Sequence, residues 1–229
     1  MSERKKLEFT YDRPGDGALP LFVDAEPGEP CAFQWRPDFY AEHLALTTGN
    51  AISGNADIPW DDANIQEIYI ESRYALEVLN TFERPEWVEP LVRILPSQSS
   101  VVFDGGIEKV HPVAIFFKSL DFDFACQIAK RYGNGAAMFV GDAPVDTFPQ
   151  CAICLFPFSL SCSSEYLAIA TAAGAKIIAS DAGSSIEWLT KYGKVGEWLV
   201  VYEHDAAEYV EAVKYIEGKP STFGAICKP

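Results

Sequence analysis

Basic residues are scarce in this sequence. Its 229 residues include 18 lysines and arginines against 33 aspartates and glutamates, which gives a formal net charge of −15 at pH 7. A surface with this charge repels the phosphates of nucleic acids and of anionic lipids. The composition therefore argues against a general nucleic-acid-binding or membrane-surface protein, and leaves room only for a local basic pocket.

Long apolar runs are also missing. No stretch reaches the ~18 residues that a transmembrane helix needs. The charged first residues, Met1–Lys6, are not followed by the apolar segment of a secretory signal. We therefore expect a cytoplasmic protein with no transmembrane segment. Apolar residues make up 48% of the chain and charged residues 22%, as in average globular proteins, so we expect a sizeable core.

Cysteine occurs six times, without the spacing of a metal site. A zinc site needs four ligands, usually in two close pairs, whereas Cys151 and Cys154 form a single close pair. A thioredoxin-type pair opens a helix, but these two lie in the apolar run 151–156. A disulfide framework is not expected in a reducing compartment. We therefore predict that Cys151 and Cys154 are small buried residues of a strand and that they bind no metal.

Histidine occurs three times, at His43, His111 and His204. No Ser-His-Asp, H-E-x-x-H or P-loop pattern accompanies these residues. For His43, a partly buried structural role is favoured over that of a catalytic base. The catalytic residues are therefore unknown at this stage.

Residues 1–99 are expected to form a small irregular α+β region. Short apolar segments such as 31–35 lie between proline- and glycine-containing turn signals, which predicts a few short strands. Apolar residues at helical spacing predict a helix over 63–79, and a second, shorter helix is expected over 85–95.

Residues 100–217 alternate regularly between strand and helix patterns. The expected strands are 100–103, 136–140, 151–156, 176–180 and 198–202, and the expected helices are 122–132, 164–173, 184–192 and 206–217. Most of these strands are continuous apolar runs, as expected when both faces of a parallel sheet are covered. The pattern predicts an α/β fold with a doubly wound, mostly parallel, Rossmann-like sheet of about five strands, in a domain of residues 100–229.

Ligands of such sheets bind beyond the carboxyl ends of the strands. The loops at these ends are rich in Gly, Ser and Asp, and they comprise residues 104–106, 141–142, 158–164 and 181–185. Asp104–Gly106 allows close approach of backbone N–H groups to a diphosphate, with Lys109 and Lys118 as the nearest cations. Asp181–Ser185 is either a nest for a phosphate or sugar hydroxyl or a turn closed by a Ser184–Glu187 capping box. Ser159–Glu165 either holds a ribose or sugar or is a serine-rich helix start.

The segment 170–189, which reads ATAAGAKIIASDAGSSIEWL, resembles the donor-binding half of retaining glycosyltransferases of the GT-B fold. In that family a helix ends in a small-residue-Gly turn, and a strand reading P-V-I-A-S-D, a Gly-rich turn and another helix follow. The order of the segments 101–109, 138–142, 155–159 and 202–216 is similar as well. The resemblance spans residues 100–217 and is most specific over 170–189.

The chain differs from this family at several donor-binding positions. Ser161 and Ile169 stand where the family carries two glutamates. Gly106 stands where the family has an arginine, and Lys109 is a shifted counterpart of its lysine. Residues 1–99 are too short and irregular for the first of the two Rossmann-like domains of a complete GT-B enzyme.

The resemblance implies a glycosyltransferase that takes a nucleotide sugar as co-substrate, needs no further cofactor and transfers a glycosyl group to an unknown acceptor. The donor-binding residues it implies are Gly105, Gly106, Lys109, Ser163, Ser164, Glu165, Asp181, Gly183 and Ser184. The alternative is a non-catalytic GT-B-like protein that serves as a structural, assembly or interaction component, as a homo-oligomer or with a protein partner. Nucleotide binding distinguishes the two.

Overall fold

The computed structural model describes residues 31–34, 65–70, 72–80, 92–94, 102–103, 107–141, 143–159, 164–202 and 204–222. The chain divides into two compact units, one of Tyr11–Ser97 and one of Met1–Thr10 together with Gln98–Pro229. Within the described residues, none of the helices combines the length and the apolarity needed to cross a membrane.

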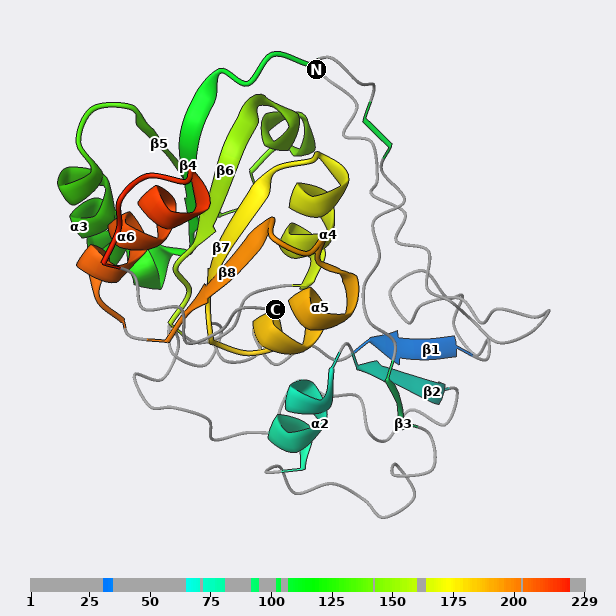
Figure 1. The fold of residues 1–229 in the computed structure, drawn as a ribbon. Coiled ribbons are helices and arrows are strands. Elements are labelled where there is room, and N and C mark those ends of the chain that lie inside the picture. Colours follow the sequence, from blue (N-terminus) through cyan, green and yellow to red (C-terminus); the bar gives the residue numbers. More distant parts are fainter. Residues whose placement is uncertain are drawn as a thin grey trace. The chain divides into compact units, whose positions relative to one another are not determined.

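The larger unit is built on a five-stranded sheet in which every neighbouring pair is parallel (Figure 1). The strands are β4 (His111–Phe117), β5 (Ala136–Val140), β6 (Cys151–Phe156), β7 (Lys176–Ser180) and β8 (Trp198–Val201), in the spatial order β5-β4-β6-β7-β8. The first strand of this sheet along the chain, β4, lies in its interior; β5 pairs with one side of it, and the chain then crosses over so that β6 pairs with the other side. The order therefore reverses between β4 and β6, and ligands of doubly wound folds bind at such switch points.

Helices cover both faces of this sheet, which makes the fold α/β and Rossmann-like as the sequence predicts. The helical segments are η3 (Ser119–Asp121), α3 (Phe122–Tyr132), η4 (Val145–Gln150), α4 (Ser164–Ala172), α5 (Ser185–Tyr192) and α6 (Ala206–Ile216). Side chains of α3 and α6 share one buried cluster with Val113 and Ile115 of β4. Side chains of η4, α4 and α5 share the other cluster with Phe116.

Strand β6 shows why these strands read as continuous apolar runs. Ile153 and Leu155 belong to the cluster under α3 and α6, whereas Cys154 and Phe156 belong to the cluster under α4 and α5. All four side chains are buried. Because successive side chains of a strand point to opposite faces, a sheet covered on both faces requires apolar residues at every position.

The first strand of the sheet is not the one that the sequence predicts. Val102 and Phe103 of the expected strand 100–103 have no regular structure, and the Val102 side chain is 91% exposed. The strand in this place is β4, whose residues Val113–Phe117 are buried and which pairs with both β5 and β6. The run 113–117 forms the strand in place of 100–103, because an interior strand must be apolar on both faces and this run is the longer apolar one.

The smaller unit contains a three-stranded parallel sheet in the order β1-β2-β3 and one described helix. Its elements are β1 (Cys31–Gln34), β2 (Ile65–Ile70), α2 (Arg73–Leu79) and β3 (Val92–Ile94). Strand β1 confirms the expected strand over 31–35. The expected helix 63–79 is wrong over 65–70, and the expected helix 85–95 is wrong over 92–94.

Strand β2 and helix α2 explain the first of these errors. Ile68 and Ile70, two residues apart, are both buried, and β2 pairs with a strand on each side. Its β-branched isoleucines favour a strand over a helix in this environment. The helix starts only after Ser72, whose buried hydroxyl accepts a hydrogen bond of 3.0 Å from the backbone N–H of Ala75. This N-cap separates the two elements.

Candidate functional site

The carboxyl ends of β6, β7 and β8 lie next to one another and surround a pocket of about 140 Å³. The residues that line it are Phe158, Ser159, Ser180, Asp181, Ala182, Val201, Tyr202, His204 and Tyr209. Each segment that follows one of these strands contributes to the lining, and Tyr209 comes from α6. The pocket therefore occupies the edge at which parallel sheets bind their ligands.

Short hydrogen bonds hold the rim of this pocket together. The Ser180 hydroxyl donates to the backbone carbonyl of Phe158 at 2.7 Å, which ties β7 to the segment after β6. The backbone N–H of Asp181 donates to the carbonyl of Val201 at 3.2 Å, which ties β7 to β8. The Asp181 side chain itself is exposed, so its carboxylate faces solvent at this rim.

Aromatic rings position His204 beside the pocket. Its imidazole stacks on Phe124 of α3 with 3.6 Å between ring centroids, and Phe124 meets Tyr209 edge-on at 5.7 Å. His204 is otherwise exposed. These contacts hold a ring that can donate or accept a hydrogen bond at the pocket lining.

The switch point between β4 and β6 adjoins the same pocket through Phe158 and Ser159. One carboxylate oxygen of Asp121, a buried residue just after β4, accepts hydrogen bonds from both the backbone N–H and the hydroxyl of Ser159. The Lys118 ammonium lies 5.6 Å from the centroid of the Phe158 ring. A carboxylate and a hydroxyl thus meet where the strand order reverses, and a cation lies over the neighbouring Phe158 ring.

The size and polarity of the pocket suit one small polar ring. A cavity of about 150 Å³ holds a single benzene ring, so the pocket of about 140 Å³ has room for one five- or six-membered ring. The exposed carboxylate of Asp181 accepts hydrogen bonds from hydroxyl groups and repels phosphates. The lining therefore favours a ribose or sugar ring over a phosphate group.

Only part of the predicted site lies at this pocket. Asp181 is a lining residue, and Gly183, with φ of +66°, turns the chain from β7 towards α5. Ser164 and Ser184 are buried at the starts of α4 and α5, and Glu165 is half-buried; none of the three lines the pocket. The predicted residues outside the described part of the chain are Gly105, Gly106 and Ser163.

The structure also differs from the expected role of Ser184 in a capping box. Ser184 is the residue before α5, but its side chain makes no hydrogen bond to the first turn of that helix. The neighbouring Ser185 hydroxyl instead donates to the carbonyl of Ala182 at 2.9 Å. The turn is held by Ser185, and the capping box does not form.

Lys109 lies away from the other predicted residues. It precedes β4, so it belongs to the amino edge of the sheet, and its ammonium donates to the backbone carbonyl of Ala173 at 3.0 Å. Ala173 follows directly after α4, where a cation stabilises the exposed carbonyls of the helix end. The structure therefore does not bring Lys109 together with Asp181.

Three residues at or beside this pocket were not predicted as site residues from the sequence. Asp121 follows β4, whose place in the sheet the sequence assigned to an earlier segment, and Tyr202 and His204 follow the correctly placed β8. Lys118, which also follows β4, was named from the sequence as a nearby cation. The signal for Asp121 was the apolar run 113–117, whose carboxyl end is followed by polar residues. For Tyr202 and His204 the only signal was their place after an expected strand.

Cys151 and Cys154 are buried residues of β6, as predicted. Burial raises the pKa of the Cys154 thiol well above its ordinary value, which keeps it protonated and unreactive. Cys151 donates from its thiol to the carbonyl of Thr147 at 3.2 Å. Among the described residues, no group of three or more His, Cys, Asp or Glu side chains could hold a metal ion.

The fold and the position of the pocket define a Rossmann-like α/β protein with a candidate ligand site at the carboxyl edge of its sheet. No family model matches the sequence, and a search of curated proteins found no match. Among solved structures, the chain is similar to the crystal structure of the pneumococcal O-GlcNAc transferase GtfA in complex with UDP and GlcNAc. The identity is 12% and the TM-score 0.44, over 69% of this chain and 40% of that transferase. The chain thus spans less than half the length of that transferase.

Proposed function

We propose that this chain binds a nucleotide sugar at the carboxyl edge of its parallel sheet and acts as a glycosyltransferase-like protein. The observation that carries the proposal is the pocket between β6, β7 and β8, with the exposed carboxylate of Asp181, the hydroxyl of Ser159 and the imidazole of His204 in its lining. These groups offer both acceptors and donors to the hydroxyl groups of one ring. The sequence resemblance to GT-B donor-binding domains supports the same ligand class.

The diphosphate of such a ligand requires a cation outside the pocket. Lys118 is the candidate for this cation, because its ammonium contacts Phe158, a lining residue. In this arrangement the ring occupies the pocket, and the phosphates extend from it towards the switch point between β4 and β6. Charge that develops on the leaving diphosphate during glycosyl transfer is stabilised best by groups already held in place.

A non-catalytic protein on the same fold is the second candidate function. In its favour, several of the expected donor-binding residues that the structure describes lie outside the pocket: Ser164 and Ser184 are buried, and Lys109 caps a helix at the opposite edge. In this case the chain acts through its surface, and nucleotides do not stabilise it.

Thermal unfolding with a ligand panel separates the two candidates. The panel contains UDP, GDP, ADP, CMP and their sugar conjugates, with uridine, adenosine and free sugars as partial ligands. A ligand at about 100 times its Kd stabilises by about 2.7 kcal/mol, a rise in Tm of roughly 5–10 °C for a chain of this length. A rise with one nucleotide sugar supports the proposal. No rise with any ligand contradicts it and favours the non-catalytic candidate.

A substitution at the pocket then tests the position of the ligand. Asp181→Asn keeps the size of this exposed side chain and removes its charge, so we expect an unchanged Tm without ligand and at least about tenfold weaker binding. Glu197→Gln is the matched control, because Glu197 precedes β8 at the opposite edge. Equal binding by both variants would place the ligand elsewhere. Release of free nucleoside diphosphate from the bound sugar conjugate then measures catalysis.

A further inference from the structure

The two edge strands of the five-stranded sheet differ in exposure. All four residues of β8, Trp198–Val201, are buried. Each residue of β5, at the other edge, is at least partly exposed, and Val140 is 58% exposed. Within the described part of the chain, β5 pairs only with β4, which leaves the hydrogen-bonding groups of its outer edge without a strand partner.

Strand β5 carries none of the features that normally protect an exposed edge. Its sequence, Ala-Ala-Met-Phe-Val, contains no charge and no proline. Its pairing with β4 is regular over all five residues, from Val113–Ala136 to Phe117–Val140, without a bulge. Proteins usually protect unpaired edge strands with charges, prolines or bulges, and an edge strand without them can pair with a strand of another chain.

Helix α3 lies beside this edge and contacts both β4 and β5. Phe124 faces α6, since it stacks on His204 and meets Tyr209. Helical spacing places Phe122, Cys126 and Ala129, four and three residues apart, on the side of α3 opposite Phe124, with Ala129 also packed against the buried cluster beneath the helix. Phe122 is 52% exposed, and the other two are half-buried. An apolar stripe thus continues the apolar edge strand.

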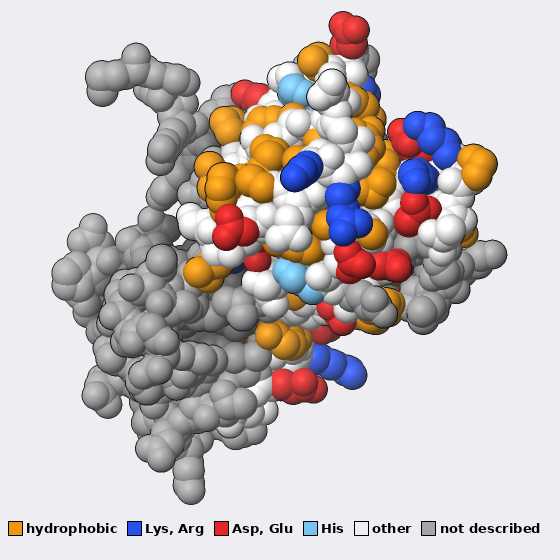
Figure 2. Space-filling model, turned by 90° about the vertical axis from the view of Figure 1, so that its left-hand side faces the viewer, with side chains coloured by type: hydrophobic (Ala, Val, Ile, Leu, Met, Phe, Trp, Pro, Cys, Tyr) orange, Lys and Arg blue, Asp and Glu red, His pale blue; other side chains and the backbone are white. Residues whose placement is uncertain are grey.

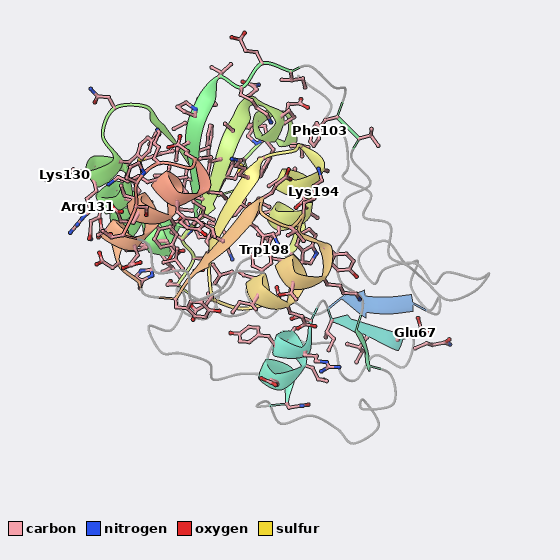
Figure 3. The ribbon with its side chains drawn as sticks, viewed as in Figure 1. Glu67, Phe103, Lys130, Arg131, Lys194 and Trp198 are labelled. Atoms are coloured by element: carbon pink, nitrogen blue, oxygen red, sulfur yellow. The ribbon has the colours of Figure 1, made fainter. Side chains whose placement is uncertain are left out.

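Charges mark the two ends of the same helix. Asp123 lies in its first turn, and Lys130 and Arg131 lie in its last. All three side chains are exposed, and Figure 3 shows Lys130 and Arg131 projecting outwards from α3. Figure 2 views the molecule from the side on which Figure 1 shows α3 and β5. On the described part of this face, apolar side chains lie between charged ones.

We propose that β5 and α3 form the interface of a homodimer. Two copies pair their β5 edges antiparallel about a twofold axis perpendicular to the sheet, which joins the two five-stranded sheets into one. Such an interface is self-complementary, as a twofold axis requires. The acidic first turn of one α3 then meets the basic last turn of the other, so the charges at the two ends attract. This proposal is independent of the ligand at the carboxyl edge.

The spacing of sheets and helices supports this arrangement. Neighbouring strands lie about 4.8 Å apart, so two helices that each cover the β4–β5 boundary come to lie about 10 Å apart across the seam. Packed helices have interaxial distances of about 8–10 Å. The two α3 helices run antiparallel there, with Phe122 of one copy against Ala129 of the second copy. Cys126 lies close to the axis. A large side chain thus faces a small one on each side.

The first measurement is the mass in solution, by sedimentation or light scattering. We expect twice the 25.3 kDa of one chain at about 100 μM, a concentration at which an interface of micromolar Kd is occupied. Ala129→Lys places a charge in the seam and is expected to raise the dimer Kd by at least about tenfold. Gln127→Lys adds the same charge on the exposed side of α3 and should leave the dimer intact.

Cysteine cross-linking tests the orientation. Mild oxidation with copper phenanthroline is expected to produce a covalent dimer, and Cys126→Ser should abolish it without changing the mass measured by sedimentation. A wild-type chain that stays monomeric at about 100 μM would overturn the proposal. So would a dimer that tolerates Ala129→Lys, or a covalent dimer that persists in Cys126→Ser.

Discussion

Asp121 holds Ser159 through two hydrogen bonds to a single carboxylate oxygen. The backbone N–H of Ser159 donates to Asp121 Oδ1 at 3.1 Å, and the Ser159 hydroxyl donates to the same oxygen at 2.6 Å. Asp121 follows β4 and Ser159 follows β6, so these bonds join the two strands between which the sheet order reverses. The Asp121 carboxylate therefore fixes one wall of the candidate pocket.

Asp121→Ala should lower the free energy of unfolding. The variant removes the buried carboxylate that accepts two hydrogen bonds from Ser159, which costs about 2 kcal/mol. Thermal unfolding should show a fall in Tm of roughly 4–8 °C. Asp181→Asn, at an exposed carboxylate of the same edge, is the matched control and should unfold like the wild type. Equal Tm values for Asp121→Ala and wild type would refute the structural role of these bonds.

Gly193→Ala should destabilise the end of α5. A Cβ atom at this position would lie 2.5 Å from the carbonyl oxygen of Leu189 and 2.6 Å from Cδ1 of Trp198, a buried residue labelled in Figure 3. Relief of such contacts requires shifts of the backbone and the indole, which typically cost 1–3 kcal/mol. Urea unfolding measures this loss. Val195→Ala, at a side chain 83% exposed, is the control and should have almost no effect.

Asp205→Ala should weaken the start of α6. The Asp205 side chain accepts a hydrogen bond of 2.9 Å from the backbone N–H of Ala207, and loss of such an N-cap costs about 1 kcal/mol. Asp205→Ser preserves the acceptor and should retain most of the stability. Amide hydrogen exchange in the first turn of α6 is the sensitive readout. Unchanged exchange in Asp205→Ala would show that this cap contributes little.

Glu211 predicts a pH dependence at the carboxyl-terminal side of α6. Hydrogen bonds from Lys214 and from the backbone N–H of Thr222 lower the pKa of the Glu211 carboxyl from 4.5 to about 2. Since the pKa is lowered by folding, the stabilisation is fully present above pH 4.5 and is lost as the pH falls towards 2.

The matched variant for this prediction is Glu211→Gln. The difference in urea midpoint between wild type and variant should be constant near neutral pH and should shrink below pH 4.5. An NMR titration of the Glu211 carboxyl checks the pKa itself. A difference between the two proteins that stays constant down to pH 2 would contradict the assignment.

Four strands of the parallel sheet were predictable because local signals agreed with the tertiary environment. Gly174 and Gly218, with φ of +66° and +74°, end the turns that follow α4 and α6, and β6 occupies the predicted 151–156 range. The strand β4 was missed, since a shorter apolar run followed by Asp-Gly-Gly resembled a strand and its loop. Strand β2 was mistaken for helix because its isoleucines also fit a helical spacing.

The sequence by itself determined the class of fold, since alternating buried strands and amphipathic helices have few other stable arrangements. The site depended on the tertiary structure. The strand order puts Ser159, Asp181 and His204 at one pocket, although they lie far apart in the chain. The same order places Lys109 at the opposite edge. Local sequence patterns indicate which residues form a strand. Whether the loop after a strand lies at the carboxyl or the amino edge of the sheet depends on which segments become strands and in which direction they run. Long-range strand pairing determines both.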